Sequence, residues 1–189
     1  MMTVPELDKH IADHIQGGFG QADMALLKEE IEKLEPGKIH VQIGIDEGRS
    51  LRTAHEYAPE GVWIIGIDIH DPTNTPGLNR AQFMEKEGMV GIGKRCFYIH
   101  GDADEFSDLL WNVQGETIPD GWVDLLFIDG HHGYEDVKKN TLKWESWVKF
   151  GGVILFHDID HLETRKFLND HYGLGQWEDC HGKIGRVRR

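Results

Sequence analysis

The fold is decided by residues 122–137, which read WVDLLFIDGHHGYEDV. The run from Trp122 to Ile128 is almost continuously apolar, with branched and aromatic side chains, and such a run is typical of a strand buried on both faces of a sheet. A polar turn from Asp129 to Gly133 follows, and apolar residues then recur at helical spacing from Tyr134 onward. A buried strand that leads through a short turn into a helix is the unit from which parallel α/β sheets are built.

The same unit recurs along the chain. Four further apolar runs occupy residues 39–43, 62–67, 96–99 and 153–156. Each run is followed directly by Gly, Asp or His. Segments with helical spacing occupy residues 22–34, 50–57, 103–113, 134–148 and 162–172, and Phe150-Gly151-Gly152 is expected to break the chain before the last strand. The alternation predicts a doubly wound, mostly parallel, Rossmann-like α/β sheet with helices on both faces. Residues 183–188 alternate in polarity and predict a C-terminal antiparallel strand, and a helix over 78–87 is expected inside the irregular connection 71–93.

A length of 189 residues suits a single domain. We expect an N-terminal helical segment over residues 1–37, the core of the domain over 38–160, and a C-terminal helix and hairpin over 161–189.

The composition narrows the class of partners. The chain carries 20 basic and 33 acidic residues, a net charge of −13, so the phosphates of nucleic acids and membrane surfaces would be repelled. Its two cysteines, Cys96 and Cys180, lie outside any C-x-x-C pair and cannot form a disulfide framework. The first residues lack the apolar core of a signal peptide, and no apolar run approaches the ~18 residues that cross a bilayer. We therefore expect a cytoplasmic protein without nucleic-acid or membrane partners.

The chemistry is expected at the ends of the strands, because ligands of doubly wound sheets bind outside the carboxyl ends of the strands. The first such end, residues 44–50, is a Gly-x-x-x-Gly turn that leads into a helix, and by itself it fits a structural turn as well as a ligand site. It is not a Gly-x-Gly-x-x-Gly motif, and Asp46 and Glu47 stand where a pyrophosphate would bind.

Two acids at the next strand ends fit a nucleoside. Asp68 follows the second apolar run, where an acid typically binds the two ribose hydroxyls, and its alternative role is that of a turn or cap residue. Asp102 could accept a hydrogen bond from an adenine amino group, or it could cap the helix that begins at Ala103.

Residues 126–137 and 150–158, LFIDGHHGYEDV and FGGVILFHD, carry a resemblance to a known family. Over residues 38–160 the chain resembles the class I S-adenosylmethionine (SAM)-dependent methyltransferases. More narrowly, it is similar to the branch that includes the macrocin and mycinamicin sugar O-methyltransferases and a methyltransferase-like protein of cephalosporin biosynthesis. The resemblance implies that Gly44, Gly48 and Ser50 border the methionine part of SAM, that Asp68 holds the ribose, and that Asp102 and Ala103 hold the adenine.

The sequence departs from this pattern at two places. Gln42 stands two residues before the first glycine, where many class I enzymes have an acid. The fifth strand ends in His157-Asp158, where the metal-dependent sugar enzymes have two acids.

Methyl transfer to a hydroxyl requires a deprotonated oxygen, and a divalent cation such as Mg²⁺ would lower the pKa of that hydroxyl. Asp129 and Asp158 end neighbouring strands and are expected to converge on one ion, with His157 as the third ligand. His132 is expected to act as general base, and in the resembled sugar enzymes the same Asp-x-x-His spacing supplies one ligand and the base. The alternatives are that Asp158 and Asp160 cap the helix near Leu162 and that His131 is the base.

The sequence thus predicts a SAM-dependent O-methyltransferase that acts on a small hydroxylated molecule. Two alternatives remain open at this point: a nicotinamide-dependent oxidoreductase, because Asp68 also suits the ribose of that cofactor, and a non-catalytic protein that binds SAM or another nucleoside. The sequence identifies neither the acceptor nor the oligomeric state, although related enzymes often form homo-oligomers.

Overall fold

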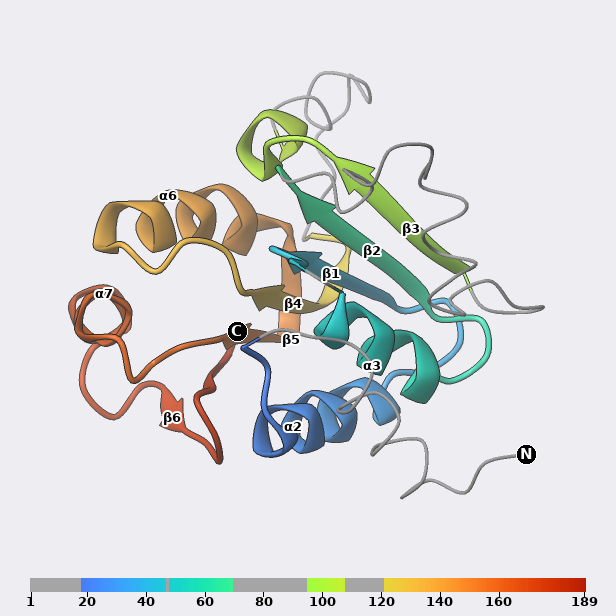
Figure 1. Ribbon diagram of the computed structural model, residues 1–189, viewed down its shortest axis with the longest axis horizontal. Helices are drawn as coiled ribbons and strands as arrows, with labels where there is room; N and C mark the ends of the chain where they lie inside the picture. The colour runs from blue at the N-terminus through green and yellow to red at the C-terminus, as the bar shows by residue number, and fades with distance from the viewer. Residues whose placement is uncertain (1–17, 47, 70–94, 108–120) are drawn as a thin grey trace.

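The computed structural model describes residues 18–46, 48–69, 95–107 and 121–189. Its described residues form a seven-stranded sheet in the order β3-β2-β1-β4-β5-β7-β6 (Figure 1). The strands are β1 (Ile39–Ile43), β2 (Trp63–Asp68), β3 (Arg95–His100), β4 (Val123–Ile128), β5 (Val148–Phe156), β6 (Glu178–Asp179) and β7 (Gly185–Arg188). Strands β1 to β5 run parallel, and β7 is antiparallel to both β5 and β6. The predicted doubly wound sheet with a C-terminal antiparallel strand is therefore confirmed.

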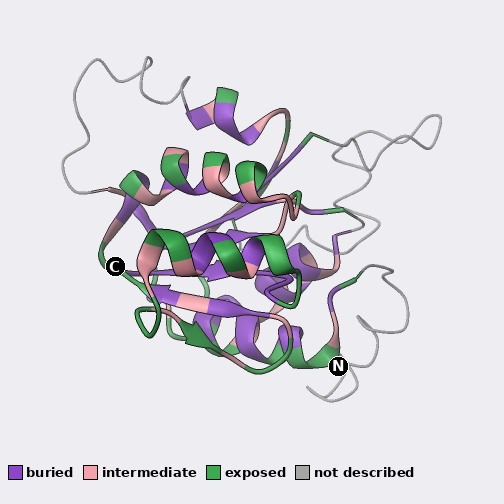
Figure 2. Cartoon of the chain, turned by 90° about the vertical axis from the view of Figure 1, so that its left-hand side faces the viewer, coloured by how far each residue is buried: buried purple, intermediate pink, exposed green. Residues whose placement is uncertain are grey.

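Helices cover both faces of the sheet. They are α2 (Gln21–Glu32), α3 (Arg49–Tyr57), α6 (Tyr134–Trp144) and α7 (Leu162–Tyr172), with a short 3₁₀ turn η1 (Glu145–Trp147). Helices α2 and α3 lie on one face, and α6 and α7 lie on the other (Figure 1). Each helix turns buried residues towards the sheet and exposed residues outward (Figure 2). No helix in the described parts of the chain is both long enough and apolar enough to cross a membrane.

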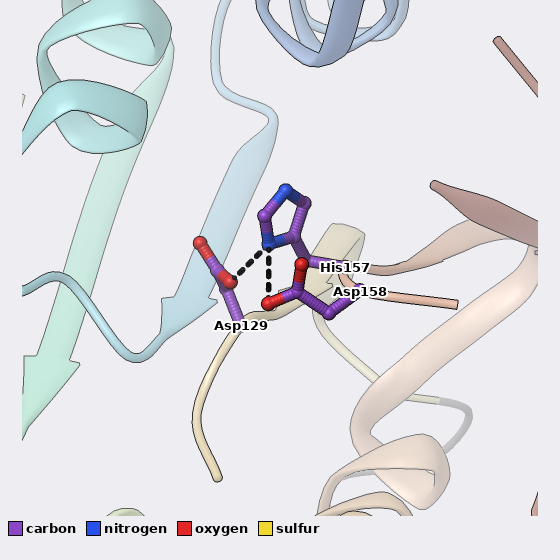
Figure 3. A group of neighbouring side chains, drawn as sticks. All are labelled: Asp129, His157 and Asp158. Carbon is purple, nitrogen blue, oxygen red and sulfur yellow. Dashed lines mark ion pairs between the residues drawn. The ribbon is translucent and has the colours of Figure 1, made fainter. Parts of the chain in front are cut away.

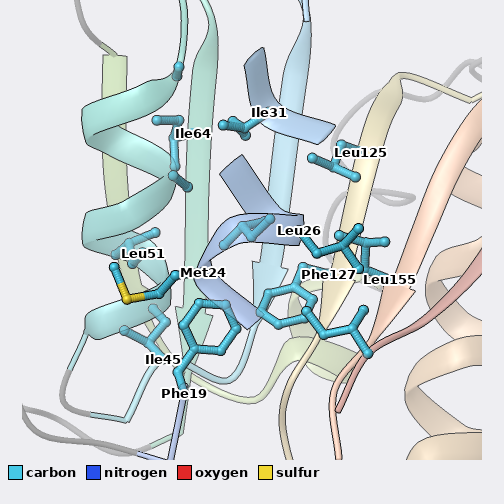
Figure 4. Packing of buried hydrophobic residues seen from close by; sticks show 14 of the residues in the cluster. Phe19, Met24, Leu26, Ile31, Ile45, Leu51, Ile64, Leu125, Phe127 and Leu155 are labelled. Atoms are coloured by element: carbon cyan, nitrogen blue, oxygen red, sulfur yellow. The ribbon is translucent and has the colours of Figure 1, made fainter. Parts of the chain in front are cut away.

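Strand β4 shows why its sequence is almost continuously apolar. Leu125 and Phe127 pack in the cluster beneath α2 and α3 (Figure 4), whereas Leu126 and Ile128 pack against α6 and α7. Successive side chains of a strand point to opposite faces, so a strand covered on both faces needs apolar residues at every position. Burial of each such side chain stabilises the fold by about 1.5–3 kcal/mol.

Two predicted boundaries were wrong. We expected a helix over 134–148, a break at Phe150-Gly151-Gly152, and a strand from Val153; instead α6 ends at Trp144 and β5 already begins at Val148. Val123 pairs with Val148 whereas Leu125 pairs with Val153, so β5 contains extra residues that bulge out. Gly151 has φ +82°, a conformation that glycine adopts without strain, and this lets the strand continue through the bulge.

Some predictions fall outside the described residues. They include the helix over 78–87 and all of the predicted helix 103–113 except residues 103–107, which are helical.

The sheet order creates a site for a ligand. Strand β1 is flanked by β2 on one side and by β4 on the other, so the connections leave its carboxyl end in opposite directions. This reversal of strand order opens a crevice at the carboxyl ends of β1 and β4.

Candidate active site

A cleft of about 380 Å³ lies at this crevice. Its walls contain residues that follow all five parallel strands, and Gly18 and Phe19 before α2 close one side. Nine of the ten predicted site residues line the cleft: Gly44, Ser50, Asp68, Asp102, Ala103, Asp129, His132, His157 and Asp158. Gly48 does not line it; this residue is buried and caps the start of α3.

The turn after β1 is held in place from beneath. Gly44 has φ +83°, and a Cβ at this position would overlap the carbonyl oxygen of Asp129 and lie 2.5 Å from its carbonyl carbon. Buried Gln42 donates from Nε2 to the carbonyl of Gly44 at 2.8 Å and to Ser50 Oγ at 2.5 Å. The glutamine therefore fixes the shape of the turn.

Asp68 and Asp102 both have structural roles as well as places in the cleft. Asp68 Oδ2 accepts hydrogen bonds from the backbone N–H groups of Ile45 at 2.5 Å and Asp46 at 2.9 Å, so it ties the end of β2 to the turn after β1. Asp102 Oδ1 accepts from the N–H of Asp104 at 2.8 Å, so the capping role considered for Asp102 is present in the structure.

Asp129, His157 and Asp158 converge at the ends of β4 and β5 (Figure 3). His157 Nδ1 lies 2.7 Å from Asp129 Oδ1 and 3.3 Å from Asp158 Oδ2. Asp158 has φ +51°, an uncommon backbone conformation that aspartate tolerates better than most residues, and its carboxylate reaches back towards His157.

This group fits a divalent cation. Two neighbouring ligands of an octahedral ion bound at about 2.1 Å lie roughly 3.0 Å apart. The 2.7 and 3.3 Å contacts bracket that separation. The ring nitrogens of His157 lie close to carboxylates but have no aligned hydrogen bond among the described residues. Atoms that converge on one ion need not lie along each other's N–H directions, so this arrangement is compatible with a bound cation.

The charges in this group are strongly coupled. Burial alone would lower the pKa of His157, but its contacts with Asp129, Asp158 and Asp23 raise that pKa to about 11. Burial raises the pKa of Asp129, whereas the neighbouring cationic groups outweigh burial at Asp158 and lower its pKa. A cation that binds through Nδ1 would displace the proton from that nitrogen, since metals take the neutral imidazole.

His132 is placed to act as a base. Its Nε2 lies 3.2 Å from Asp158 Oδ2, and its side chain is 38% exposed, so the ring can both be oriented by a carboxylate and reach a ligand in the cleft. The ring of His161 lies beside it, with centroids 4.9 Å apart. His131 also lines the cleft, and it is exposed.

Sequence reasoning missed residues from both ends of the chain. Lys183 Nζ lies 3.3 Å from Asp158 Oδ1, and Asp23 Oδ2 lies 3.4 Å from His157 Nε2. Asp23 reads in the sequence as an ordinary acid in the first turn of a helix, and Lys183 as part of a hairpin. Nothing in local spacing links either residue to the end of β5.

The sequence also did not predict a second group of polar side chains, which lies on the opposite side of the cleft. Asp104 Oδ1 accepts from Asn140 Nδ2 at 3.0 Å, and Asp104 Oδ2 lies 2.6 Å from Lys139 Nζ. This group joins the helix after β3 to α6 and lines the cleft next to Asp102.

Comparison with known proteins identifies a family and one protein that matches part of this chain. A family model described as a methyltransferase domain matches residues 41–159. Over 63 residues, 33% of this chain, the sequence is 36% identical to an uncharacterized protein, y4gI, of Sinorhizobium fredii (strain NBRC 101917 / NGR234). The match covers only 6% of that protein's length.

Two solved structures have a similar fold. CalS11, a TDP-rhamnose 3'-O-methyltransferase of calicheamicin biosynthesis, aligns with a TM-score of 0.63 and 14% identity over 99% of this chain and 87% of that chain. MycE, a methyltransferase of mycinamycin biosynthesis solved with Mg, SAH and mycinamycin VI, aligns with a TM-score of 0.56 and 20% identity over 86% of this chain and 38% of that chain. The expected likeness in fold to sugar and macrolide O-methyltransferases is confirmed.

Proposed function

The chain belongs to this methyltransferase-domain family, and from that premise we propose that it transfers a methyl group from SAM to a hydroxyl of a small molecule with the help of a divalent cation. One observation carries the proposal. Two carboxylates, an imidazole ligand and a candidate base converge beside a cleft at the carboxyl edge of the sheet.

The cleft suits SAM better than a nicotinamide dinucleotide. Seven aspartates line it, and the lysine and arginine side chains among its walls are Lys139 and Arg49. Such a surface attracts the positive sulfonium and repels a pyrophosphate. We propose that Asp68 binds the ribose, that Asp102 and Ala103 bind the adenine, and that Gly44 and Ser50 border the methionine part. Gly48 would contribute only by shaping the start of α3.

Asp129, His157 and Asp158 would hold the divalent cation. When bound, such an ion would lower the pKa of the acceptor hydroxyl and orient it. His132 would take the hydroxyl proton on the ring nitrogen that does not face Asp158, and the contact of Nε2 with Asp158 would orient the imidazole and stabilise its protonated form. The oxygen would then attack the methyl carbon in line with the C–S bond, which breaks to leave S-adenosylhomocysteine (SAH).

The acceptor that we propose is a sugar or a glycosylated natural product. The two similar structures are named for a TDP-rhamnose 3'-O-methyltransferase and for a complex with the macrolide mycinamycin VI. A non-catalytic protein on the same fold is the second candidate, because Lys183 already contacts Asp158 and could compete with a cation there.

A SAM-turnover assay tests the proposal. The chain is dialysed against EDTA and incubated with SAM and a panel of nucleotide sugars and glycosylated macrolides, and SAH formation is measured with and without Mg²⁺. We expect turnover that EDTA suppresses and Mg²⁺ restores. The Asp129→Asn variant should lose this turnover. Asp170→Asn is the matched control, because this exposed acid pairs with Lys166, does not line the cleft and should retain the Mg²⁺ response.

Two results would contradict the proposal. Full turnover after EDTA dialysis would remove the cation from the mechanism. Binding of SAH without turnover on any acceptor would favour the non-catalytic protein.

A further inference from the structure

The imidazole of His157 is held on several sides. Its ring packs against Phe19 and Phe127, with centroid separations of 5.3 and 6.1 Å, and these two rings also contact each other. Nδ1 faces the carboxylates of Asp129 and Asp158, and the other ring nitrogen points away from them (Figure 3). Only 4% of the residue is exposed, so the partner of that second nitrogen must come from the protein.

Among the described residues, Asp23 places a carboxylate beside this nitrogen. Its Oδ2 lies 3.4 Å from His157 Nε2 and accepts from the N–H of Gly20 at 2.8 Å, while Oδ1 accepts from the N–H of Lys183 at 2.7 Å. Asp23 is 3% exposed, and a Cβ at Gly182 would overlap its Oδ1, so the C-terminal hairpin packs directly on the carboxylate. These contacts leave the carboxylate one fixed orientation, with one oxygen on Nε2.

A carboxylate on the far nitrogen of a metal-binding histidine keeps the proton on that nitrogen. The near nitrogen then presents its lone pair to the ion and becomes a stronger ligand. The neighbouring Asp23 carboxylate also favours a histidine over an acid at position 157. An acid there would place two carboxylates face to face in a buried environment, which strongly disfavours ionisation of both.

We propose that Asp23 is a positioning residue that orients His157 so that Nδ1 faces the cation site. The proposal rests on the proposed function, since it assumes that His157 is a ligand. It extends the site beyond the strand ends to α2 and the C-terminal hairpin, both of which hold the Asp23 carboxylate.

A double-mutant cycle tests whether Asp23 acts through His157. The affinity for Mn²⁺ is measured by calorimetry for the unmodified chain, Asp23→Asn, His157→Asn and the double variant. Asparagine at position 23 keeps an acceptor for Lys183 but loses the negative charge facing Nε2. Asparagine at position 157 keeps a polar atom near the place of Nδ1 but has no Nε2.

We expect Asp23→Asn, as a single substitution with His157 present, to weaken Mn²⁺ binding by about 10- to 100-fold relative to the unmodified chain. In the His157→Asn background it should weaken binding by less than about twofold, because the coupled group is absent. Asp170→Asn is the control of matched chemistry, because this exposed acid lies outside the cleft, and it should leave Mn²⁺ binding within about twofold. Equal weakening in both backgrounds would assign Asp23 a merely structural role and overturn the proposal, as would unchanged affinity in Asp23→Asn.

A measurement on the unmodified chain covers the case in which a variant fails to fold. Long-range ¹H–¹⁵N spectra of the Mg²⁺-loaded protein should show the proton of His157 on Nε2 and none on Nδ1. A proton on Nδ1, or no binding of Mn²⁺ or Mg²⁺ by the unmodified chain, would overturn the proposal. SAH binding, measured in parallel, reports on the proposed methyl transfer independently of this result.

Discussion

Gly44 shows how a single residue joins the two strands that form the crevice. Any side chain there would meet the backbone of Asp129 and would have to adopt φ +83°. We expect Gly44→Ala to lower the free energy of unfolding by about 2–4 kcal/mol, measured by urea denaturation. Gly101→Ala is the control, because a Cβ at position 101 would have nothing within 4 Å, and its change should stay within about 0.5 kcal/mol. Equal effects of the two substitutions would mean that the turn relaxes freely.

His132 is the residue on which the proposed chemistry depends most. We expect His132→Gln to lower turnover by roughly 10²- to 10⁴-fold and to leave the affinity for SAM nearly unchanged, because a general base acts on the acceptor and not on the cofactor. His131→Ala should cost much less. A larger loss from His131→Ala would move the base by one position, and no loss from either would leave hydroxyl activation to the cation.

At the scale of residues, the sequence predicted the candidates that sit directly at strand ends. Asp129, His157 and Asp158 could be foreseen because each follows an apolar run, and the topology of parallel strands brings such positions together. Asp23 and Lys183 could not, because their contacts depend on how α2 and the C-terminal hairpin dock against the sheet. Docking is set by packing of whole elements, which local sequence does not encode.

At the scale of elements, Asp68 connects β2 to the turn between β1 and α3. Its Oδ2 accepts from two backbone N–H groups, and Asp68→Ala would leave both donors without that acceptor. We expect this substitution to lower the free energy of unfolding by about 1–3 kcal/mol and to weaken SAH binding markedly in calorimetry. Loss of stability with unchanged SAH affinity would remove Asp68 from the cofactor site while keeping its role in the turn.

The existence of the strands was easier to predict than the residues at which they begin and end. The five parallel strands follow from apolar runs, because burial on both faces leaves a strong signal. The start of β5 was missed because Gly151 and Gly152 have the composition of a break, yet they accommodate a bulge within a continuous strand. Trp144 and Trp147, at the end of α6 and in the turn before β5, lie in the core and are 0% and 1% exposed.

At the scale of the whole molecule, His40 links stability to pH. It is fully buried in the central strand, and burial lowers its pKa from 6.5 to about 4. The folded chain thus keeps His40 neutral, whereas the unfolded chain takes up a proton below pH 6.5, so stability from this group is full above pH 6.5 and falls as the pH drops towards 4.

We expect acidification from pH 7.5 to pH 5 to cost the unmodified chain roughly 2 kcal/mol through His40. His40→Leu should lose that component, so the difference in unfolding free energy between the two chains should change by this amount between the two pH values. Urea denaturation at both pH values measures it. Parallel pH profiles of the two chains would show that His40 does not carry the effect.

The family, the sheet order and the acidic cleft all bear on one claim, that the crevice between β1 and β4 binds SAM. Thermal unfolding in the presence of SAH, with NAD as the comparison, tests this claim most directly, because it needs neither an acceptor nor a metal. At a concentration about 100 times the Kd, SAH should stabilise the native chain by about 2.7 kcal/mol and raise the Tm by about 5–10 °C, whereas NAD should leave it unchanged. A Tm that rises with NAD but not with SAH would contradict the account, and so would a Tm that neither compound raises.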